Sequence, residues 1–288
     1  MISRTHLRQF LAVVDSGSFT RAAAQIHVTQ PTLSAGISAL EHQLGARLFA
    51  RSNRRVQLTA AGNRLLAHAR TIEREFREAE ESVTGIAAPV QPIRLGLLLS
   101  LSTDRIERAL TAYAGVEPIE IIEGGEREVN GALTHGRIDL AVTILHPEAN
   151  RFAAESLYTE PYRLALPANH PLADRETVAA EEIAGETMIA RRACEMLSET
   201  SRHFTERGVR PPFSFRSAND DRAMAMVRAG LGITVAPESL GGPGVAMPLM
   251  TGFDESREIG LLFGPHWNVD RNEHPLVEAL RLIPTASC

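Results

Sequence analysis

The sequence predicts an α/β protein with a small, mostly helical N-terminal unit and a larger C-terminal unit of two lobes. Short helical patterns separated by glycines fill the first 58 residues. A heptad-spaced apolar pattern lies in residues 59–88, and strand patterns then alternate with helix patterns over residues 92–288. Because such alternation builds a parallel sheet flanked by helices, we expect a helical domain, a linker helix and an α/β domain.

Capping residues mark the helices of the N-terminal unit. An apolar stripe over residues 7–14 predicts a first helix that Gly17 ends in a left-handed conformation. Ser18 is the expected N-cap of a short second helix, and a turn at residues 27–28 leads to Thr29, the expected N-cap of a third. Two helices joined by such a turn form a helix-turn-helix. The expected inward stripe of the third helix is Leu33, Ile37, Leu40 and Leu44.

The third helix presents polar side chains on its other face. In a helix-turn-helix this helix enters the major groove of DNA. Gln30 suits that place because its amide can pair bidentately with adenine. A basic, hairpin-like segment follows at residues 47–58 and predicts a wing. The expected DNA-contacting residues are Thr29, Gln30, Pro31, Thr32, Ser34, Ser38, Arg51, Arg54 and Arg55.

The charge of the N-terminal unit supports a role in binding DNA. Residues 1–62 contain seven arginines and two acidic residues, a net charge of +5, whereas the whole chain carries −5. A positive module on an acidic protein is what neutralisation of DNA phosphates requires. The alternative is a small helical packing domain with a solvated polar face, in which residues 1–62 only mediate assembly.

The N-terminal residues also resemble a known family, the LysR-type transcriptional regulators. The resemblance covers the DNA-binding domain in order and spacing, and the chain length fits the family. Residues 35–36 depart from it, because Ala-Gly stands where many relatives carry a long basic or amide side chain. The matching residues are Phe10, Ser18, Phe19, Ala22, Ala23, residues 28–34, Ile37, Leu40, Glu41, Leu44, Gly45, Leu48, Phe49, Arg51, Leu58, Thr59 and Gly62.

The resemblance implies the architecture of the rest of the chain. It implies a winged helix-turn-helix over residues 1–58, a dimerisation helix over residues 59–88 and a two-lobed, periplasmic-binding-protein-like effector domain. Lobe I is expected at about residues 92–163 and 264–288, and lobe II at about residues 164–263. The implied partners are double-stranded DNA, a second copy of the chain in a dimer, a tetramer built from dimers, and RNA polymerase.

The linker carries a pattern typical of helix pairing. Its apolar residues are spaced alternately by four and three and are flanked by Arg and Glu, so a second copy would cover them. The alternative is a long amphipathic helix that lies on its own C-terminal domain. The residues of this seam are Leu65, Ala69, Ile72, Phe76, Ala79 and Val83, among which Leu65, Ile72 and Phe76 are expected to hold the dimer.

An effector site is expected where strands of the α/β domain end. Ligands of open α/β sheets bind outside the carboxyl ends of strands, near helix N-termini. Serines, a glycine turn, an arginine pair and an asparagine follow successive strand patterns there, and we expect an anionic or polar metabolite among them. Each of these residues has a simpler alternative as a helix cap or in a surface ion pair. The expected effector-binding residues are Ser100, Ser102, Gly124, Glu126, Arg191, Cys194 and Asn219.

Cys194 supports a second hypothesis, thiol-based redox sensing. Peroxide-sensing members of the family place a reactive cysteine near the corresponding position, and Arg191 and Arg192 would stabilise a thiolate. Those sensors also use a resolving cysteine a short distance on, whereas this chain offers only Cys288.

The remaining composition predicts a cytoplasmic protein without catalytic or metal chemistry. No apolar run reaches the roughly 20 residues that span a bilayer, and no signal sequence precedes the first helix. The acidic pairs at residues 181–182 and 220–221 are expected to be solvated charges, and the histidines lack metal-ligand spacing. We therefore expect no cofactor apart from a small-molecule effector. The alternative from another class of function is a two-lobed binding protein or an enzyme.

Overall fold

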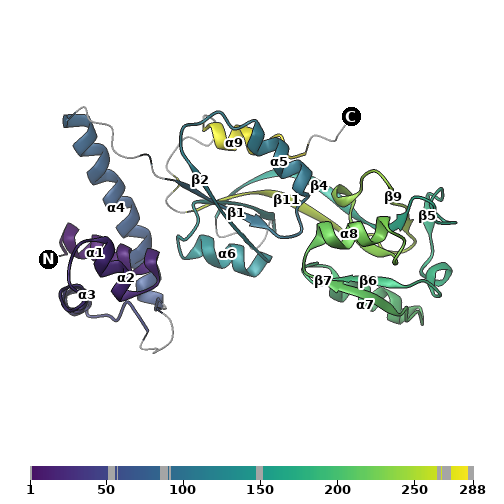
Figure 1. Cartoon of the computed structure of the whole chain (residues 1–288), viewed down its shortest axis with the longest axis horizontal. Helices are drawn as coiled ribbons and strands as arrows, with labels where there is room; N and C mark the ends of the chain where they lie inside the picture. Colours follow the sequence, from purple (N-terminus) through teal and green to yellow (C-terminus); the bar gives the residue numbers. More distant parts are fainter. Residues whose placement is uncertain are drawn as a thin grey trace.

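The N-terminal unit of the computed structural model has the expected three helices and caps (Figure 1). The structure describes residues 2–50, 56, 58–84, 90, 92–146, 152–264, 267 and 274–284. Gly17 and Gly45 end their helices with a φ of 63°, and the side chains of Ser18 and Thr29 accept capping bonds. The capping predictions are therefore confirmed. The helices are α1 (Arg4–Ser16), α2 (Phe19–Gln25) and α3 (Gln30–Leu44).

The core of this unit differs from the sequence prediction at one end of α3. Leu33, Ile37 and Leu40 are buried as expected, but Leu44 is 36% exposed. The side chain of Glu41 takes the inward place instead and is 8% exposed. After α3, Phe49 and Leu58 pair as an antiparallel bridge, which forms the base of a wing.

The linker helix α4 (Ala60–Thr84) packs its first turns on the helices α1–α3, which we call the head, and extends beyond them (Figure 1). Leu66 and Ala69 are fully buried against the helices of the head, so part of the predicted seam is used within the chain. Further along, Ile72 and Phe76 are 37% and 44% exposed. Arg4 of α1 holds this second part through an ion pair with Glu73.

Lobe I is built on a mixed sheet. Strands β2, β1 and β3 are parallel, whereas β11 is antiparallel to β3 and β4, so the sheet is not the purely parallel one expected. Helices α5 and α9 pack on one face and α6 on the other (Figure 1). The elements are β1 (Ile93–Leu98), α5 (Thr103–Thr111), β2 (Ile119–Gly124), α6 (Glu126–Thr134), β3 (Leu140–Ile144), β11 (Ser256–Phe263) and α9 (Pro275–Leu280).

Lobe II continues from the long strand β4 (Ala153–Pro167), which pairs with β11 in its first half and with β8 in its second. A parallel pair, β6 and β7, is joined to this sheet at Met188. The other elements are β5 (Thr177–Val178), η1 (Ala180–Ile183), β6 (Met188–Arg191), α7 (Leu197–Glu206), β7 (Phe213–Ser217), α8 (Asp220–Arg228), β8 (Thr234–Pro237), η2 (Glu238–Leu240), β9 (Val245–Ala246) and β10 (Leu249–Met250).

The boundary between the lobes lies at the start of β11 and not at its end near residue 263. Ile259, Leu261 and Phe263 are buried in the core of lobe I together with β1 and β3. Both crossings between the lobes are therefore close to Pro161 and Ser256, which face each other in the strand register. No helix in the described part of the chain is long and apolar enough to cross a bilayer.

Candidate functional site

The start of α3 presents an ordered polar surface to solvent. Thr29 accepts the backbone N–H of Thr32 at 3.3 Å, and the two hydroxyls lie 2.8 Å apart. Gln30 Nε2 donates to Ser34 Oγ at 2.9 Å, which holds the amide along the helix. Ser34 is half-buried, and the other predicted contacts on α3 are exposed: Thr29, Gln30, Pro31, Thr32 and Ser38.

Gly36, one of the two residues that depart from the family pattern, lies against the side chain of Gln9. A Cβ at Gly36 would lie 1.9 Å from Oε1 of Gln9, whose side chain is buried beneath α3. A side chain at residue 36 would therefore displace the amide end of Gln9. Ala35 is exposed and has no polar group, so the hydrogen-bonding capacity of this surface comes from the neighbouring polar residues.

Glu41 positions the chain that leads into the wing, a role that the sequence did not indicate. Its Oε1 accepts the backbone N–H groups of Leu48 at 2.8 Å and Phe49 at 3.3 Å. Its Oε2 accepts from Arg47 at 2.7 Å. The family pattern includes Glu41, but only the fold reveals that this carboxylate pairs with amides seven and eight residues later. The predicted wing contacts Arg51, Arg54 and Arg55 lie outside the described residues.

A cluster of charged and hydroxyl groups joins the two lobes around Arg257 of β11. Its Nε donates to Glu160 Oε1 at 2.9 Å, and its Nη1 donates to Ser100 Oγ at 2.7 Å. Its Nη1 also contacts Glu195 Oε1 at 2.5 Å, and Nη2 donates to the carbonyl of Ser100 at 3.0 Å. Ser100 belongs to lobe I and Glu195 to lobe II. We call Ser100, Glu160, Tyr162, Glu195 and Arg257 the bridging cluster.

The bridging cluster is buried and keeps its charges. Burial disfavours the charged form of Arg257, but Glu160 and Glu195 outweigh it and raise the pKa of Arg257 above its ordinary value. Burial likewise opposes ionisation of Glu195, but Arg257 and the Tyr162 hydroxyl lower the pKa of Glu195 below its usual value. Among the described residues, Oε2 of Glu195 has no hydrogen-bond partner although it is buried. This oxygen is an acceptor left open between the lobes.

The helix N-termini next to the bridging cluster face each other. Ser102 is the buried N-cap residue of α5, and the neighbouring Thr103 Oγ1 donates to Asp221 Oδ2 of α8 at 2.7 Å. Asn219 caps α8 by accepting the N–H of Arg222 at 2.7 Å. This is the helix-cap role that we gave as the simpler alternative to effector binding. The structure therefore gathers the predicted residues Ser100, Ser102 and Asn219 at the surface where the lobes meet.

Two predicted effector residues have local partners in lobe I. Gly124 is buried at the end of β2, and its carbonyl accepts from Leu99 at 3.0 Å. Glu126 opens α6 and pairs with His146 at 2.8 Å. Their contact with an effector stays a prediction.

Arg191 anchors β6 to α8 through a buried ion pair with Asp220. Its Nε donates to Asp220 Oδ1 at 2.9 Å, Nη2 contacts the other carboxylate oxygen, and Nη1 donates to the carbonyl of Val235 at 3.1 Å. The simpler alternative for Arg191 is a surface ion pair, but the side chain is 1% exposed and the pair is internal. With all three nitrogens engaged, Arg191 is a structural residue in this conformation.

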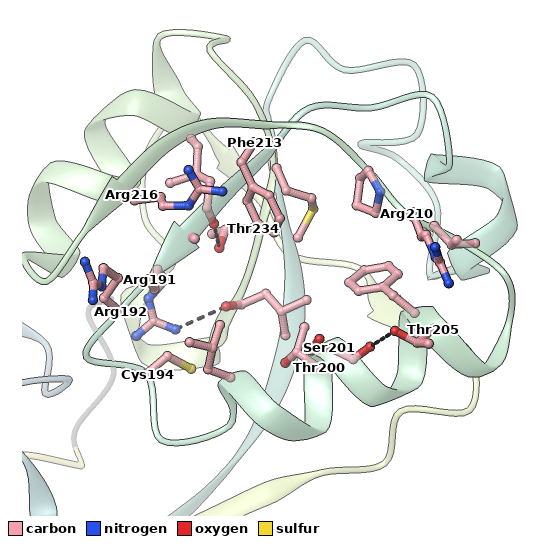
Figure 2. Close-up of a pocket in the computed structure, with 18 residues that line it drawn as sticks. Arg191, Arg192, Cys194, Thr200, Ser201, Thr205, Arg210, Phe213, Arg216 and Thr234 are labelled. Carbon is pink, nitrogen blue, oxygen red and sulfur yellow. Dashed lines mark hydrogen bonds between the residues drawn. The ribbon is translucent and has the colours of Figure 1, made fainter.

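Cys194 is half-buried at the end of β6, beside the same cavity as Arg191 (Figure 2). Burial raises the pKa of the Cys194 thiol, and the charge of Arg191 offsets this only in part. Cys288, the only other cysteine in the sequence, lies outside the described residues. The thiol is therefore mainly protonated near neutral pH, which disfavours attack on an oxidant.

The acidic pairs at residues 181–182 and 220–221 are not both solvated as expected, because Asp220 is only 5% exposed. Asp220 holds Arg191, and Glu182 Oε2 accepts the N–H of Ala179 at 2.8 Å. The described part of the chain contains no group of three or more His, Cys, Asp or Glu side chains that could hold a metal ion.

Comparisons with known proteins agree with this division of the chain. The family model "Bacterial regulatory helix-turn-helix protein, lysR family" matches residues 5–63, and the "LysR substrate binding domain" model matches residues 88–281. The "Hydrogen peroxide-inducible genes activator" of Pectobacterium carotovorum is 30% identical over 236 residues, which are 80% of this chain and 78% of that protein.

A second relative is named only as a transcriptional regulator. The "HTH-type transcriptional regulator AlsR" of Bacillus subtilis is 31% identical over 243 residues, 81% of this chain and 80% of that protein. Full-length OxyR from Pseudomonas aeruginosa, a single-residue variant, superimposes with a TM-score of 0.73 at 22% identity and covers 98% of this chain and 95% of that one; this likeness concerns the fold. The chain belongs to the LysR family of DNA-binding transcriptional regulators.

Proposed function

We propose that this LysR-type regulator is a cytoplasmic homodimer whose binding to operator DNA is set by a small polar effector between its lobes. The observation that carries the proposal is the bridging cluster, in which Ser100 of lobe I and Glu195 of lobe II meet on Arg257. An effector that binds there changes which of these contacts form. The effector can shift the equilibrium between the open and the closed arrangement of the lobes only by as much as its affinities for these two arrangements differ.

The charges of the bridging cluster indicate what kind of effector fits. Arg257 already contacts two carboxylates, so it offers little unbalanced positive charge to an anion. The open Oε2 of Glu195 needs a hydrogen-bond donor. A neutral or cationic metabolite that carries hydroxyl or amino groups suits the cluster better than the carboxylate or phosphate expected from the arginine pair at residues 191–192.

We assign DNA contacts to the exposed start of α3 and to the wing, and dimerisation to α4. Support for the dimer comes from Ile72 and Phe76, which stay partly exposed on the helix at the spacing of a paired seam. Two heads on a two-fold axis then read a palindromic operator. A tetramer of two dimers and contact with RNA polymerase complete the proposal, which includes no catalytic step.

Redox sensing through Cys194 is the second candidate. The name of the Pectobacterium relative, a hydrogen peroxide-inducible activator, favours it. AlsR is 31% identical to this chain, however, so percentage identity alone does not choose between the two candidates. The raised pKa of Cys194 and the engagement of Arg191 with Asp220 favour the metabolite.

A reporter strain that carries the promoter of the regulator's own gene tests the proposal. Polar metabolites and hydrogen peroxide are added in turn to strains with the wild type, Ser100→Ala with Ser102→Ala, or Cys194→Ser. We expect the double variant to lose its response to a metabolite while mobility shifts show DNA binding within about twofold, and Cys194→Ser to respond normally. A peroxide response that disappears only in Cys194→Ser, with no response to any metabolite, would overturn the proposal in favour of the thiol.

A further inference from the structure

Lobe II contains a cavity that is separate from the bridging cluster. It has a volume of about 660 Å³ and lies between α7 and the strands β6 and β7 (Figure 2). Cavities of roughly 300 to 1,000 Å³ are typical of small-molecule sites. The five residues of the bridging cluster are not among those that line it.

The walls of the cavity are mainly apolar. Phe204 and Val209 are buried on the α7 side, and Met188 is buried on the strand side. Leu197 and Phe213, which also line the cavity, remain 42% and 50% exposed. A ligand that covers large apolar side chains exposed in this way lowers the free energy of the complex.

Thr200 contributes an unused hydroxyl to this apolar cavity. The residue is 8% exposed, and Oγ1 has no hydrogen-bond partner among the described residues. A threonine in a helix commonly bonds the carbonyl four residues earlier, and Thr205 on the same helix does so with Ser201 at 2.8 Å (Figure 2). A buried hydroxyl without a partner is costly, and a polar ligand group would satisfy it.

The cavity is also positively charged. Its lining includes four arginines and no acidic residue. Arg191 is neutralised by Asp220, but no carboxylate in the described part of the chain lies within ion-pair distance of Arg192, Arg210 or Arg216. Figure 2 shows Arg192 and Arg216 at one end of the cavity and Arg210 at the other. Arg216 stacks over Phe213 with 4.9 Å from its guanidinium carbon to the ring centre.

We propose that this cavity is a second ligand site, which takes an amphipathic monocarboxylate. The carboxylate lies at the end with Arg192 and Arg216, where guanidinium groups bind carboxylates strongly. Thr200 lies on the α7 side, apart from these arginines (Figure 2), so its hydroxyl is left for a second polar group of the ligand. The apolar body extends between α7 and β6 toward Phe204 and Val209. The proposal for this cavity does not depend on the effector proposed between the lobes, which is polar and is assigned to a different place.

Calorimetric titration of the full-length protein with decanoate, and with decanol as its uncharged equivalent, tests this site. We expect saturable binding of one decanoate per chain and at least tenfold weaker binding of decanol. The double variant Arg192→Gln with Arg216→Gln should bind decanoate at least tenfold more weakly, and its affinity for decanol should stay within twofold of the wild type. Thr200→Val, which keeps the side-chain volume, and the matched control Arg210→Gln at the opposite end should each change decanoate binding less than twofold, because decanoate has no second polar group.

Three results would overturn the proposal. One is the absence of saturable decanoate binding below the concentration at which decanoate forms micelles. Another is an equal loss in Arg210→Gln and in the double arginine variant, since general charge and not a defined head-group site would then explain binding. The third is loss of decanoate binding in Ser100→Ala with retention in the double arginine variant, which would place the ligand between the lobes. Unchanged far-UV circular dichroism verifies that each variant is folded.

Discussion

Thr103 of lobe I donates a hydrogen bond of 2.7 Å to Asp221 of lobe II, so the N-terminal turns of α5 and α8 are tied directly to each other. Both side chains are exposed, and the bond therefore contributes little to the stability of either lobe. Its effect is on the relative position of the lobes.

Thr103→Val removes this bond without changing the side-chain size. Because an intramolecular hydrogen bond contributes about 0.5 to 1.5 kcal/mol, we expect the lobe equilibrium to shift toward an open form by roughly two- to tenfold. Distance distributions between spin labels on the two lobes measure the shift. Thr111→Val is the control, since the Thr111 hydroxyl bonds within α5 to the carbonyl of Glu107. An identical distribution for wild type and Thr103→Val would show that the bond does not hold the lobes.

Gln30→Ala tests base recognition by α3. We expect a loss of about 1 to 3 kcal/mol on the cognate operator and little change on random DNA. The truncation also releases Ser34, whose hydroxyl now accepts from the Gln30 amide. Ser34→Ala with Gln30 intact separates the two contributions in fluorescence anisotropy. Equal losses on operator and random DNA would reduce Gln30 to a structural residue.

Glu41→Ala tests the anchor of the wing. The substitution leaves the buried N–H groups of Leu48 and Phe49 without their side-chain acceptor, so we expect a loss of about 1 to 3 kcal/mol in the free energy of unfolding. Displacement of the wing should also lower the salt dependence of DNA binding. Glu41→Gln keeps one acceptor oxygen and should recover part of the stability. If chemical denaturation shows both variants to be as stable as the wild type, Glu41 does not anchor the segment that leads into the wing.

Ile72→Asp with Phe76→Asp tests the dimer. Like charges placed opposite each other in a paired seam would separate the chains, and we expect monomers with little affinity for a palindromic operator. Ser82→Asp adds a charge at an exposed residue outside the seam and should sediment as the wild type does. If the double variant keeps the native oligomer, the exposed face of α4 packs elsewhere.

The pH dependence of Cys194 alkylation tests the redox hypothesis. Because burial raises the pKa of this thiol, the neutral form is favoured in the folded protein. The associated stability is present below the ordinary thiol pKa of about 8.5 and is lost as the pH rises through the folded value. In a Cys288→Ser background, iodoacetamide labelling followed by mass spectrometry should show a midpoint above that of the denatured protein. A midpoint below it would mean a stabilised thiolate.

The sequence was most informative where structure depends on neighbouring residues. The caps at Gly17, Ser18 and Thr29 were predicted correctly because a capping bond or a left-handed φ involves only a few adjacent positions. The exposed face of α3 followed from helical periodicity in the same way. The hairpin that starts the wing was indicated as well, and Phe49 pairs with Leu58.

Long-range pairs could not be predicted from patterns. Arg257 lies 97 residues from Glu160 and 157 residues from Ser100, and no spacing rule connects such positions. The first half of β4 gives only a weak apolar signal in the sequence, because its side chains alternate between half-buried and exposed. Arg191 was read as a residue for ligands or surface acids, whereas burial of Asp220 beside it creates an internal ion pair.

The antiparallel contact of β4 with β11 restricts how the lobes can rearrange. Pro161 lies opposite Ser256 where the chain passes between the lobes, and the N–H of Tyr162 donates to the carbonyl of Glu255 at 3.0 Å. Sliding of one lobe past the other would break this ladder on both segments at once, whereas bending of the two-strand ribbon preserves it. The proposed effector would therefore act by bending this ribbon, where a small change in angle moves the far ends of the lobes the most.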